Sequence, residues 1–314
     1  MDTRFLESLI AVVESGSIAA AARLHSQDPE LKLEIWPEIR FPDDVEFALC
    51  WNHPASILQQ FPNLKCISSL GAGANHLLND DTRPLDIPLV RLVDHGLKQS
   101  MAEYLMLGVL EHFRRFKDFR QQQTHNQWTA QQIPHIFELG IGIMGYGELG
   151  QYVAKKLSDF CFNVYGWSRR PKEIDHISVY AGYDALGEFL KKANVLVCLL
   201  PLTSETKNIL NTQAFSQLPL NAYLINVARG AHLVDADLLS ALDSGQLSGA
   251  LLDVFREEPL PKHHHFWTHP KIAITPHIAS VTNPESAAEQ IIKNYYRVLS
   301  GDHLLNLVDV ECGY

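Results

Sequence analysis

The sequence predicts an α/β protein whose larger domain is built on a doubly wound parallel sheet. Short apolar runs alternate with helical patterns over most of the 314 residues, and such alternation is typical of parallel strands joined by crossover helices. Near position 145 a glycine-rich turn leads directly from an apolar run into a helical pattern. That local arrangement occurs at the centre of doubly wound sheets. The length of the chain leaves room for a second, smaller α/β domain.

Composition places the chain among ordinary globular proteins. Hydrophobic residues make up 46% and charged residues 20%, as in most globular domains. The formal net charge of -10 disfavours nucleic acid as the main partner. The longest apolar run, 195–202, is too short to cross a membrane. Five scattered cysteines without CxxC spacing indicate reduced thiols. We therefore expect a cytoplasmic protein that binds neither nucleic acid nor membrane.

The first hundred residues predict the smaller α/β layer. Candidate strands are the apolar runs at 5–13, 31–36, 46–51, 64–68 and 89–92. An alternative exists for residues 4–25, because their pattern resembles the opening helices of a winged helix-turn-helix transcription factor. The residues that follow, SQDPELKLEIWPE, provide no recognition helix, which favours the α/β interpretation.

The rest of the chain predicts the larger domain. Ser100 and Glu103 form a capping-box pattern, which predicts a long helix from 100 to about 119. Strands are predicted at 139–145, 163–167, 195–200, 223–228, 249–254 and 271–276. Helices are predicted at 148–159, 185–192, 235–244 and 284–299, the last capped by Asn283 and ending near Gly301.

The glycine-rich turn predicts a dinucleotide-binding loop. Gly145 permits the tight turn, Gly147 lets the backbone approach a pyrophosphate, and Gly150 lets the helix pack against the sheet. The N-terminus of the following helix then offers N–H groups to the phosphates. A strand before the loop and a helix after it are the context that makes this pattern specific. The predicted loop comprises Gly145, Tyr146, Gly147, Glu148, Leu149 and Gly150.

The residues after the second strand of this domain decide which dinucleotide is expected. Proteins that bind NAD usually have Asp or Glu there, and this acid accepts the ribose 2′-hydroxyl. Here Ser168 is followed by Arg169 and Arg170. A hydroxyl and two guanidinium groups suit a 2′-phosphate, which an acid would repel. We therefore expect NADP, as NADPH, in preference to NAD. The alternative is that these arginines form only a solvated turn.

Three polar residues beside predicted strands point to chemistry on a keto acid. Arg229, Glu258 and His277 each lie next to an apolar run. A permanently charged guanidinium, an acid and a titratable imidazole suffice to bind a 2-keto acid and to give it a proton. Taken singly, each residue could equally be a surface charge, a loop acid or a polar strand end. Their occurrence together with a loop for a hydride-carrying cofactor favours a reductase.

Six motifs together resemble the D-isomer-specific 2-hydroxyacid dehydrogenase family over nearly the whole chain. They are LGAGANHL (70–77), GYGELG (145–150), LLPLTSET (199–206), INVARG (225–230), LLDVFREEPLP (251–261) and ITPHIAS (274–280). LEHFRRFKDFRQQQ (110–123), WSRRPK (167–172) and the final Gly313-Tyr314 are most similar to its glyoxylate/hydroxypyruvate reductase branch. The resemblance implies a Rossmann-type cofactor domain, a flavodoxin-like substrate domain and NADPH-dependent reduction of small 2-keto acids.

The resemblance also implies catalytic roles for the three polar residues. His277 would donate a proton to the substrate carbonyl, and Arg229 would hold the carbonyl and carboxylate of the keto acid. Glu258 would pair with His277 and raise its pKa. The neighbouring Glu257 is a less suitable candidate, because the family has its catalytic acid directly before proline.

Further contacts to substrate and cofactor follow from the same resemblance. Gly71, Ala72 and Gly73 would offer backbone N–H groups to the carboxylate. Additional cofactor contacts are expected at Leu200, Pro201, Ala228 and Asp253, the last with the nicotinamide carboxamide. Trp51 follows a predicted strand, and it could either wall the substrate pocket or pack in the core.

These assignments define an expected organisation. The substrate domain would comprise residues 1–98 and 281–314, and the cofactor domain residues 99–280. A homodimer is expected, because relatives form a dimer arm after the long helix, where Trp128 could reach a neighbouring subunit. The histidines at 263–265 do not predict a metal site, since adjacent loop positions give poor ligand geometry. Two other functions stay open: a phosphoglycerate-type or D-lactate-type dehydrogenase, and a dinucleotide-sensing protein of the corepressor kind.

Overall fold

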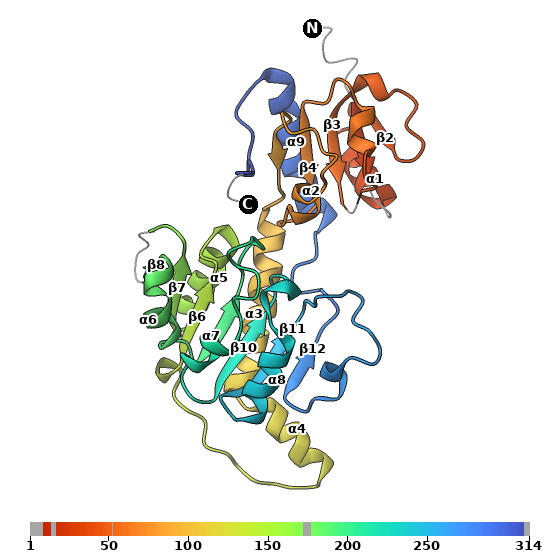
Figure 1. Cartoon of the computed structure of the whole chain (residues 1–314). Coiled ribbons are helices and arrows are strands. Elements are labelled where there is room, and N and C mark those ends of the chain that lie inside the picture. Colours follow the sequence, from red (N-terminus) through yellow and green to blue (C-terminus); the bar gives the residue numbers. More distant parts are fainter. Residues whose placement is uncertain (1–8, 14–16, 52, 172–176, 311–314) are drawn as a thin grey trace. The chain divides into compact units, whose positions relative to one another are not determined.

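The computed structural model describes residues 9–13, 17–51, 53–171 and 177–310 (Figure 1). The first part of the strand predicted at 5–13, Lys172 in the basic cluster and the final Gly313-Tyr314 lie outside these residues. The chain forms two compact units, Met1–Leu97 with Val281–Tyr314 (unit 1) and Lys98–Ser280 (unit 2). Both units are parallel α/β layers, as the sequence predicts.

Unit 1 contains a five-stranded sheet in which every paired strand is parallel. In spatial order the strands are β2 (Leu33–Ile35), β1 (Leu9–Val13), β3 (Val45–Cys50), β4 (Cys66–Ser69) and β5 (Leu89–Val90). This order, 2-1-3-4-5, is that of flavodoxin-like folds. The structure also excludes the helix-turn-helix interpretation. That interpretation requires a helix at Leu9–Val13, but these residues form β1, which lies inside the sheet and pairs with β2 and β3.

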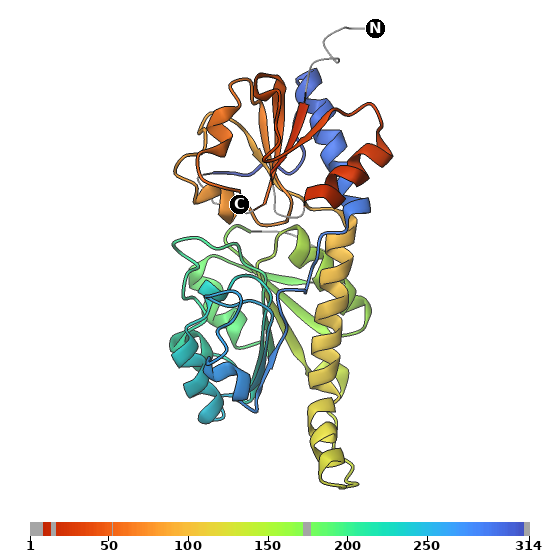
Figure 2. The same cartoon turned by 90° about the vertical axis from the view of Figure 1, so that its right-hand side faces the viewer.

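Helices cover both faces of the unit 1 sheet. One face packs against α1 (Ser17–Gln27) and α9 (Pro284–Ser300), which lie beside each other (Figure 2). The other face packs against α2 (Asn75–Leu78) and the short turn Ile57–Gln60. The helix α9 begins and ends where its caps predict: the Asn283 side chain accepts the Glu285 N–H at 2.8 Å, and Gly301 has φ +75°.

Unit 2 contains a seven-stranded sheet that is also parallel throughout. In spatial order the strands are β12 (Ile272–Ile274), β11 (Leu247–Leu252), β10 (Ala222–Asn226), β9 (Val195–Cys198), β6 (Gly140–Met144), β7 (Asn163–Ser168) and β8 (Ser178–Ala181). The sequence predicts six of these strands and misses β8. This edge strand has half-buried and exposed residues instead of an apolar run.

The two faces of this sheet bury alternate residues of each strand. Ile141, Ile143, Val195 and Val197 pack against α3 (His95–Phe113) and α5 (Glu148–Asp159). Met144, Leu196 and Cys198 face the opposite side, where α6 (Leu186–Leu190), α7 (Thr212–Ser216) and α8 (Asp235–Asp243) pack. Helices on both faces make this a doubly wound sheet of the Rossmann type.

The long helix predicted at 100–119 is wrong at both ends. The helix α3 begins at His95, because the Asp94 carboxylate accepts the Leu97 N–H at 2.9 Å and caps it. It ends at Phe113, since Arg115 adopts a left-handed conformation with φ +57°. A separate helix, α4 (Phe116–Thr124), follows and extends beyond the unit 2 sheet (Figures 1 and 2). Ser100 and Glu103 therefore lie inside α3, where a capping-box pattern has no capping role.

None of the helices in the described part of the chain has the length and apolar character needed to span a bilayer.

Candidate active site

The predicted catalytic and cofactor residues gather at one edge of the unit 2 sheet. Gly145 follows β6, Leu200 follows β9, Arg229 follows β10, and Asp253 follows β11. His277 comes three residues after β12. Because all seven strands are parallel, their carboxyl ends meet at this edge. The strand β6 lies between β7 and β9, so the glycine loop stands at the point where the strand order reverses, which is where such sheets bind ligands.

Each of the three glycines in the loop is explained by a different feature of its surroundings. Gly145 has φ +103°, and a Cβ there would lie 2.6 Å from the Leu199 carbonyl carbon. A Cβ on Gly150 would overlap the Gly145 carbonyl oxygen, so this glycine permits close packing of the helix on the loop. A Cβ on Gly147 would meet no described atom within 4 Å. The space beside Gly147 is therefore open, as the approach of a pyrophosphate requires.

The other loop residues offer mainly backbone groups. Tyr146 is buried, and its ring packs on β7, where a Cβ on Gly166 would lie 2.5 Å from the ring. The Glu148 carboxylate accepts a hydrogen bond from Lys98 Nζ at 2.7 Å. The N-cap of α5 is Gly147, which has no side chain that could cap the first N–H groups of the helix. These N–H groups are thus suited to bind phosphate.

Ser168 is the last residue of β7, and no acid stands at this strand end. The Ser168 side chain is buried, and its hydroxyl donates to the Arg170 carbonyl oxygen at 2.7 Å. Arg169 is half-buried and Arg170 is exposed. The hydroxyl proton is therefore engaged locally, and the two arginines supply the positive charge at this corner.

His277 and Glu258 form a close pair. His277 Nδ1 lies 2.7 Å from Glu258 Oε2, and Glu258 Oε1 accepts the Phe255 N–H at 2.8 Å. The Glu258 hydrogen bond raises the pKa of His277 above its ordinary value, although partial burial opposes this. Burial would raise the pKa of Glu258, but hydrogen bonds from His277 and Phe255 lower it below its ordinary value. Both shifts favour an imidazolium–carboxylate pair, and it is Glu258, not Glu257, that contacts the histidine.

Arg229 lies in the loop after β10. Its Nη1 donates to the Ala228 carbonyl oxygen at 2.6 Å. Burial lowers the pKa of the guanidinium, while the charge of Glu258 acts in the opposite direction. A Cβ on the next residue, Gly230, would overlap the Phe255 carbonyl. Glycine at 230 therefore allows the Arg229 loop to lie against the loop that carries Glu258.

His232 is a buried residue of the same loop that sequence reasoning missed. Its Nδ1 lies 3.1 Å from the Arg229 carbonyl oxygen, and its Nε2 lies 3.2 Å from the Pro201 carbonyl oxygen. Burial lowers the pKa of His232 to about 4, so the ring is neutral near pH 7. A neutral imidazole has one N–H, so it donates to one of these two carbonyl oxygens and lies beside the other, between the loops after β9 and β10. Its spacing of three residues from Arg229 is the only sequence signal that could have identified it.

Asp253 anchors the turn that carries His277. Its Oδ1 accepts hydrogen bonds from Thr275 Oγ1 at 2.6 Å and from the Ile278 N–H at 2.8 Å. Its Oδ2 accepts the Ala279 N–H at 2.8 Å. Sequence reasoning missed this arrangement, because the partners come from positions 22 to 26 residues further along the chain.

The loop predicted to bind the substrate carboxylate follows β4 in unit 1. The Gly71 N–H donates to Ser69 Oγ at 3.2 Å, so the remaining N–H candidates are those of Ala72 and Gly73. A Cβ on Gly71 would lie 2.6 Å from Trp51 Cζ3. The indole ring therefore packs directly on this glycine, it lies beside the His76 ring, whose centroid is 4.7 Å away, and it also packs against the core of unit 1.

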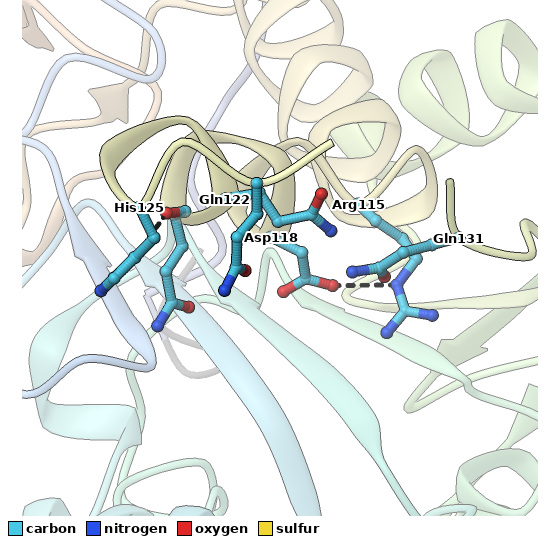
Figure 3. A pocket seen from close by; sticks show the side chains of 7 residues that line it. Arg115, Asp118, Gln122, His125 and Gln131 are labelled. Carbon is cyan, nitrogen blue, oxygen red and sulfur yellow. Dashed lines mark hydrogen bonds and ion pairs between the residues drawn. The ribbon is translucent and has the colours of Figure 1, made fainter. Parts of the chain in front are cut away.

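Other residues that the sequence singles out lie elsewhere. Trp128 is fully exposed in the segment after α4. His264 lies 3.5 Å from Asp235, and the described residues contain no group of three or more His, Cys, Asp or Glu side chains suited to a metal ion. The hollow beside α4 in Figure 3 contains none of the predicted catalytic or cofactor residues. It is lined by Arg115, Asp118, Gln121, Gln122, His125, Gln127 and Gln131.

Comparison with known families agrees with this architecture. The model of the D-isomer specific 2-hydroxyacid dehydrogenase NAD binding domain matches residues 106–279, which lie within unit 2. The chain belongs to the D-isomer specific 2-hydroxyacid dehydrogenase family, and it is an NAD(P)-dependent oxidoreductase.

Within the family, the chain is similar to proteins named glyoxylate/hydroxypyruvate reductase A. The protein of Yersinia enterocolitica is 44% identical over 275 residues, which cover 86% of this chain and 88% of the relative. The protein of Serratia proteamaculans is 43% identical over 301 residues, which cover 93% of this chain and 95% of the relative.

Two similar solved structures contain a bound dinucleotide. A family member from Xanthobacter autotrophicus in complex with NADPH and MES has a TM-score of 0.95 and 36% identity, covering 98% of this chain and 100% of that one. The NADPH-dependent glyoxylate/hydroxypyruvate reductase from Sinorhizobium meliloti, in complex with NADP and sulfate, has a TM-score of 0.92 and 34% identity, with the same coverage.

Proposed function

We propose that this protein reduces small 2-keto acids, glyoxylate and hydroxypyruvate among them, to 2-hydroxy acids with NADPH. The observation that supports this most strongly is the pair of His277 and Glu258, 2.7 Å apart, at the sheet edge that also carries Arg229 and the glycine loop. The names of the relatives and the NADP(H) complexes of the similar structures support the same assignment.

The proton would come from His277. Because Nδ1 is engaged by Glu258, the N–H at Nε2 is the one left to donate to the carbonyl oxygen of the substrate. The raised pKa of His277, due first to the Glu258 hydrogen bond, keeps the imidazolium populated before the reaction. After the transfer, the neutral ring retains its proton on Nδ1, and Glu258 holds it in that tautomer.

Arg229 would bind and orient the keto acid. A guanidinium can donate two parallel hydrogen bonds to a carboxylate or to adjacent carbonyl and carboxylate oxygens. The burial that lowers the pKa of Arg229 also removes competing water, which strengthens its attraction for an anion. Binding of this kind fixes the plane of the carbonyl group that is reduced.

The residues present fit a bound NADPH. The first N–H groups of α5 and the open space beside Gly147 suit the pyrophosphate, and Asp253 would contact the nicotinamide carboxamide. Ser168, Arg169 and Arg170 would surround the 2′-phosphate, where the chain has no acid. When bound, the cofactor supplies the hydride.

Activity on a panel of 2-keto acids tests this function. NADPH oxidation, followed at 340 nm, should proceed with glyoxylate and hydroxypyruvate, and His277→Ala should lower kcat by about 10²- to 10⁴-fold, the usual contribution of an acid–base group. The exposed loop residue His263 offers a matched control, and His263→Ala should leave kcat unchanged. Faster turnover of pyruvate or of a phosphorylated keto acid would instead favour the alternative dehydrogenases. Absence of turnover with every keto acid would favour a dinucleotide-sensing role.

Cofactor preference provides a second prediction. The combined change Ser168→Asp, Arg169→Gln and Arg170→Gln should shift the ratio of kcat/KM values toward NADH, because an acid repels the 2′-phosphate and binds a 2′-hydroxyl. Loss of two charge-assisted hydrogen bonds should cost NADPH about 3 kcal/mol, or roughly two powers of ten. Arg114→Gln, a change of an exposed arginine at the end of α3, serves as the control. An unchanged ratio in the triple variant would refute the assignment of this corner to the 2′-phosphate.

A further inference from the structure

His277 adopts a backbone conformation that its surroundings must maintain. Its φ is +56°, in the left-handed region that non-glycine residues rarely occupy. The His277 N–H donates to the Asp253 carbonyl oxygen at 2.9 Å. The next two N–H groups, of Ile278 and Ala279, donate to the Asp253 carboxylate at 2.8 Å each. Asp253 thus holds three consecutive residues of the turn, and the position of the imidazole depends on where this carboxylate lies.

Two hydroxyl groups, hydrogen-bonded in series, fix the position of the Asp253 carboxylate. Thr275 Oγ1 donates to Asp253 Oδ1 at 2.6 Å, and Tyr104 Oη lies 2.5 Å from Thr275 Oγ1. A threonine hydroxyl has one proton, and the carboxylate receives it, so the tyrosine must be the donor to Thr275. Burial raises the pKa of Tyr104 to about 12; the Thr275 hydrogen bond opposes this rise, and the charge of Asp253 adds to it. The phenol therefore keeps its proton in the pH range of ordinary assays.

Tyr104, the first residue of this hydrogen-bonded series, lies in a well-packed part of unit 2. Tyr104 belongs to α3, and the helix lies close to the sheet at Gly108, where a Cβ would be 2.7 Å from Leu251 Cδ2 and 3.4 Å from Ile225 Cδ1. The neighbouring Leu105 is fully buried in the same core. Since α3 is packed on β10 and β11, the tyrosine hydroxyl is a fixed point from which the turn can be aligned.

We propose that Tyr104 and Thr275 are positioning residues, which act through the Asp253 carboxylate to fix the turn that presents His277. This inference rests on the proposed role of His277 as proton donor. Neither hydroxyl has to touch the substrate. A carboxylate has about four lone-pair positions, and the bonds to Thr275, Ile278 and Ala279 use three of them. The remaining position on Oδ2 is available to a nicotinamide carboxamide, so both roles of Asp253 are compatible.

Thr275→Val tests the proposal, because valine keeps the shape of threonine but cannot accept from Tyr104 or donate to Asp253. A small displacement of an acid–base group lowers kcat, so kcat should fall by roughly ten- to a hundredfold. The KM values for NADPH and for the keto acid should stay within about twofold, since their direct contacts remain. The solvent deuterium isotope effect on kcat should rise, because proton transfer becomes the slower step. Tyr104→Phe should show the same changes to a smaller extent.

Two further variants separate positioning from folding. Thr275→Ser retains the hydroxyl and should restore kcat, whereas Thr124→Val, an exposed change on α4, should have no effect. Thermal unfolding of each variant reports the fold. If Thr275→Val unfolds, Tyr104→Phe and Thr275→Ser carry the test, since they preserve the shape of the core more closely.

The outcomes are distinguishable. Loss of kcat with unchanged KM and a larger isotope effect supports the proposal. Unchanged kcat in Thr275→Val and Tyr104→Phe overturns it, while wild-type turnover would leave the proposed function standing. A raised KM for NADPH with unchanged kcat also overturns it, since the network would then serve the cofactor. If the wild-type protein reduces no 2-keto acid, the proposed function itself fails.

Discussion

At the scale of single residues, the pair of His277 and Glu258 sets the expected pH dependence. The Glu258 hydrogen bond raises the pKa of His277 above 6.5. The contribution of the charged histidine to folding stability is therefore complete below pH 6.5, and it is lost as pH rises through the folded pKa of His277. Against the effect of burial, hydrogen bonds lower the pKa of Glu258 below 4.5. The contribution of the charged glutamate to folding stability is therefore complete above pH 4.5, and it is lost as pH falls through the folded pKa of Glu258. Between these limits both members of the pair are charged.

Glu258→Gln should lower the upper end of the pH range in which His277 is charged. Without the carboxylate the pKa of His277 falls toward or below its ordinary value, and reduction needs the imidazolium, so the alkaline limb of the kcat/KM profile should move to lower pH. The displacement of the alkaline limb measures how far Glu258 raises the pKa of His277. Glu257→Gln, at the exposed neighbouring acid, should leave the profile in place. An alkaline limb that stays where it is in Glu258→Gln would show that another group limits the reaction.

At the scale of elements, the glycine loop combines two different demands in one turn. Gly150 allows α5 to approach the Gly145 carbonyl, which is a requirement of packing. Gly147 is exposed, has φ -83°, and has open space where a Cβ would point. Its backbone conformation does not require glycine, so we propose that close approach of the cofactor is the reason for glycine at this position. The two residues should therefore respond differently to the same substitution.

Gly150→Ala should destabilise the fold, by about 1–3 kcal/mol, because the added methyl group is forced against the Gly145 carbonyl oxygen. Gly147→Ala should change the free energy of unfolding by less than about 0.5 kcal/mol. It should nevertheless weaken NADPH binding by about tenfold or more, equivalent to about 1.4 kcal/mol. Chemical denaturation and fluorescence titration with NADPH measure the two effects. Equal loss of stability in both variants would contradict this division of roles.

At the scale of the whole molecule, the chain leaves unit 1 after its sheet and returns to it at the end. The helix α9 buries Ala287, Ala288, Ile291 and Tyr295 against residues from the first hundred positions. The predicted domains, 1–98 with 281–314 and 99–280, differ by one residue from the compact units. Assignment of substrate binding to unit 1 stays a prediction, as do the homodimer and the cytoplasmic location.

Much of the fold and part of the site could be predicted from local pattern. Buried parallel strands are short apolar runs, so β6, β7, β9, β10 and β11 are recognisable, whereas the half-exposed edge strand β8 is not. The predicted start of α3 is wrong, because the S-x-x-E pattern at 100–103 resembles a capping box, whereas the residue that caps the helix is Asp94. Arg229, Glu258 and His277 are recognisable as candidates, since each stands in a compact motif beside a strand, and their catalytic roles stay predictions.

Local sequence pattern is enough to predict the class of this protein: two parallel α/β layers, a glycine-rich loop of the dinucleotide-binding kind, a basic corner without an acid, and an arginine, a glutamate and a histidine in a family-specific order. How these side chains are held depends on contacts between distant parts of the chain. Three sets of contacts join different loops or elements: His277 Nδ1 with Glu258, His232 with its two carbonyl neighbours, and the hydrogen bonds from Tyr104 through Thr275 to Asp253. Tyr104 and Thr275 are 171 residues apart. Hydrogen bonds depend on distance in space, and the parallel sheet brings distant loops to one edge.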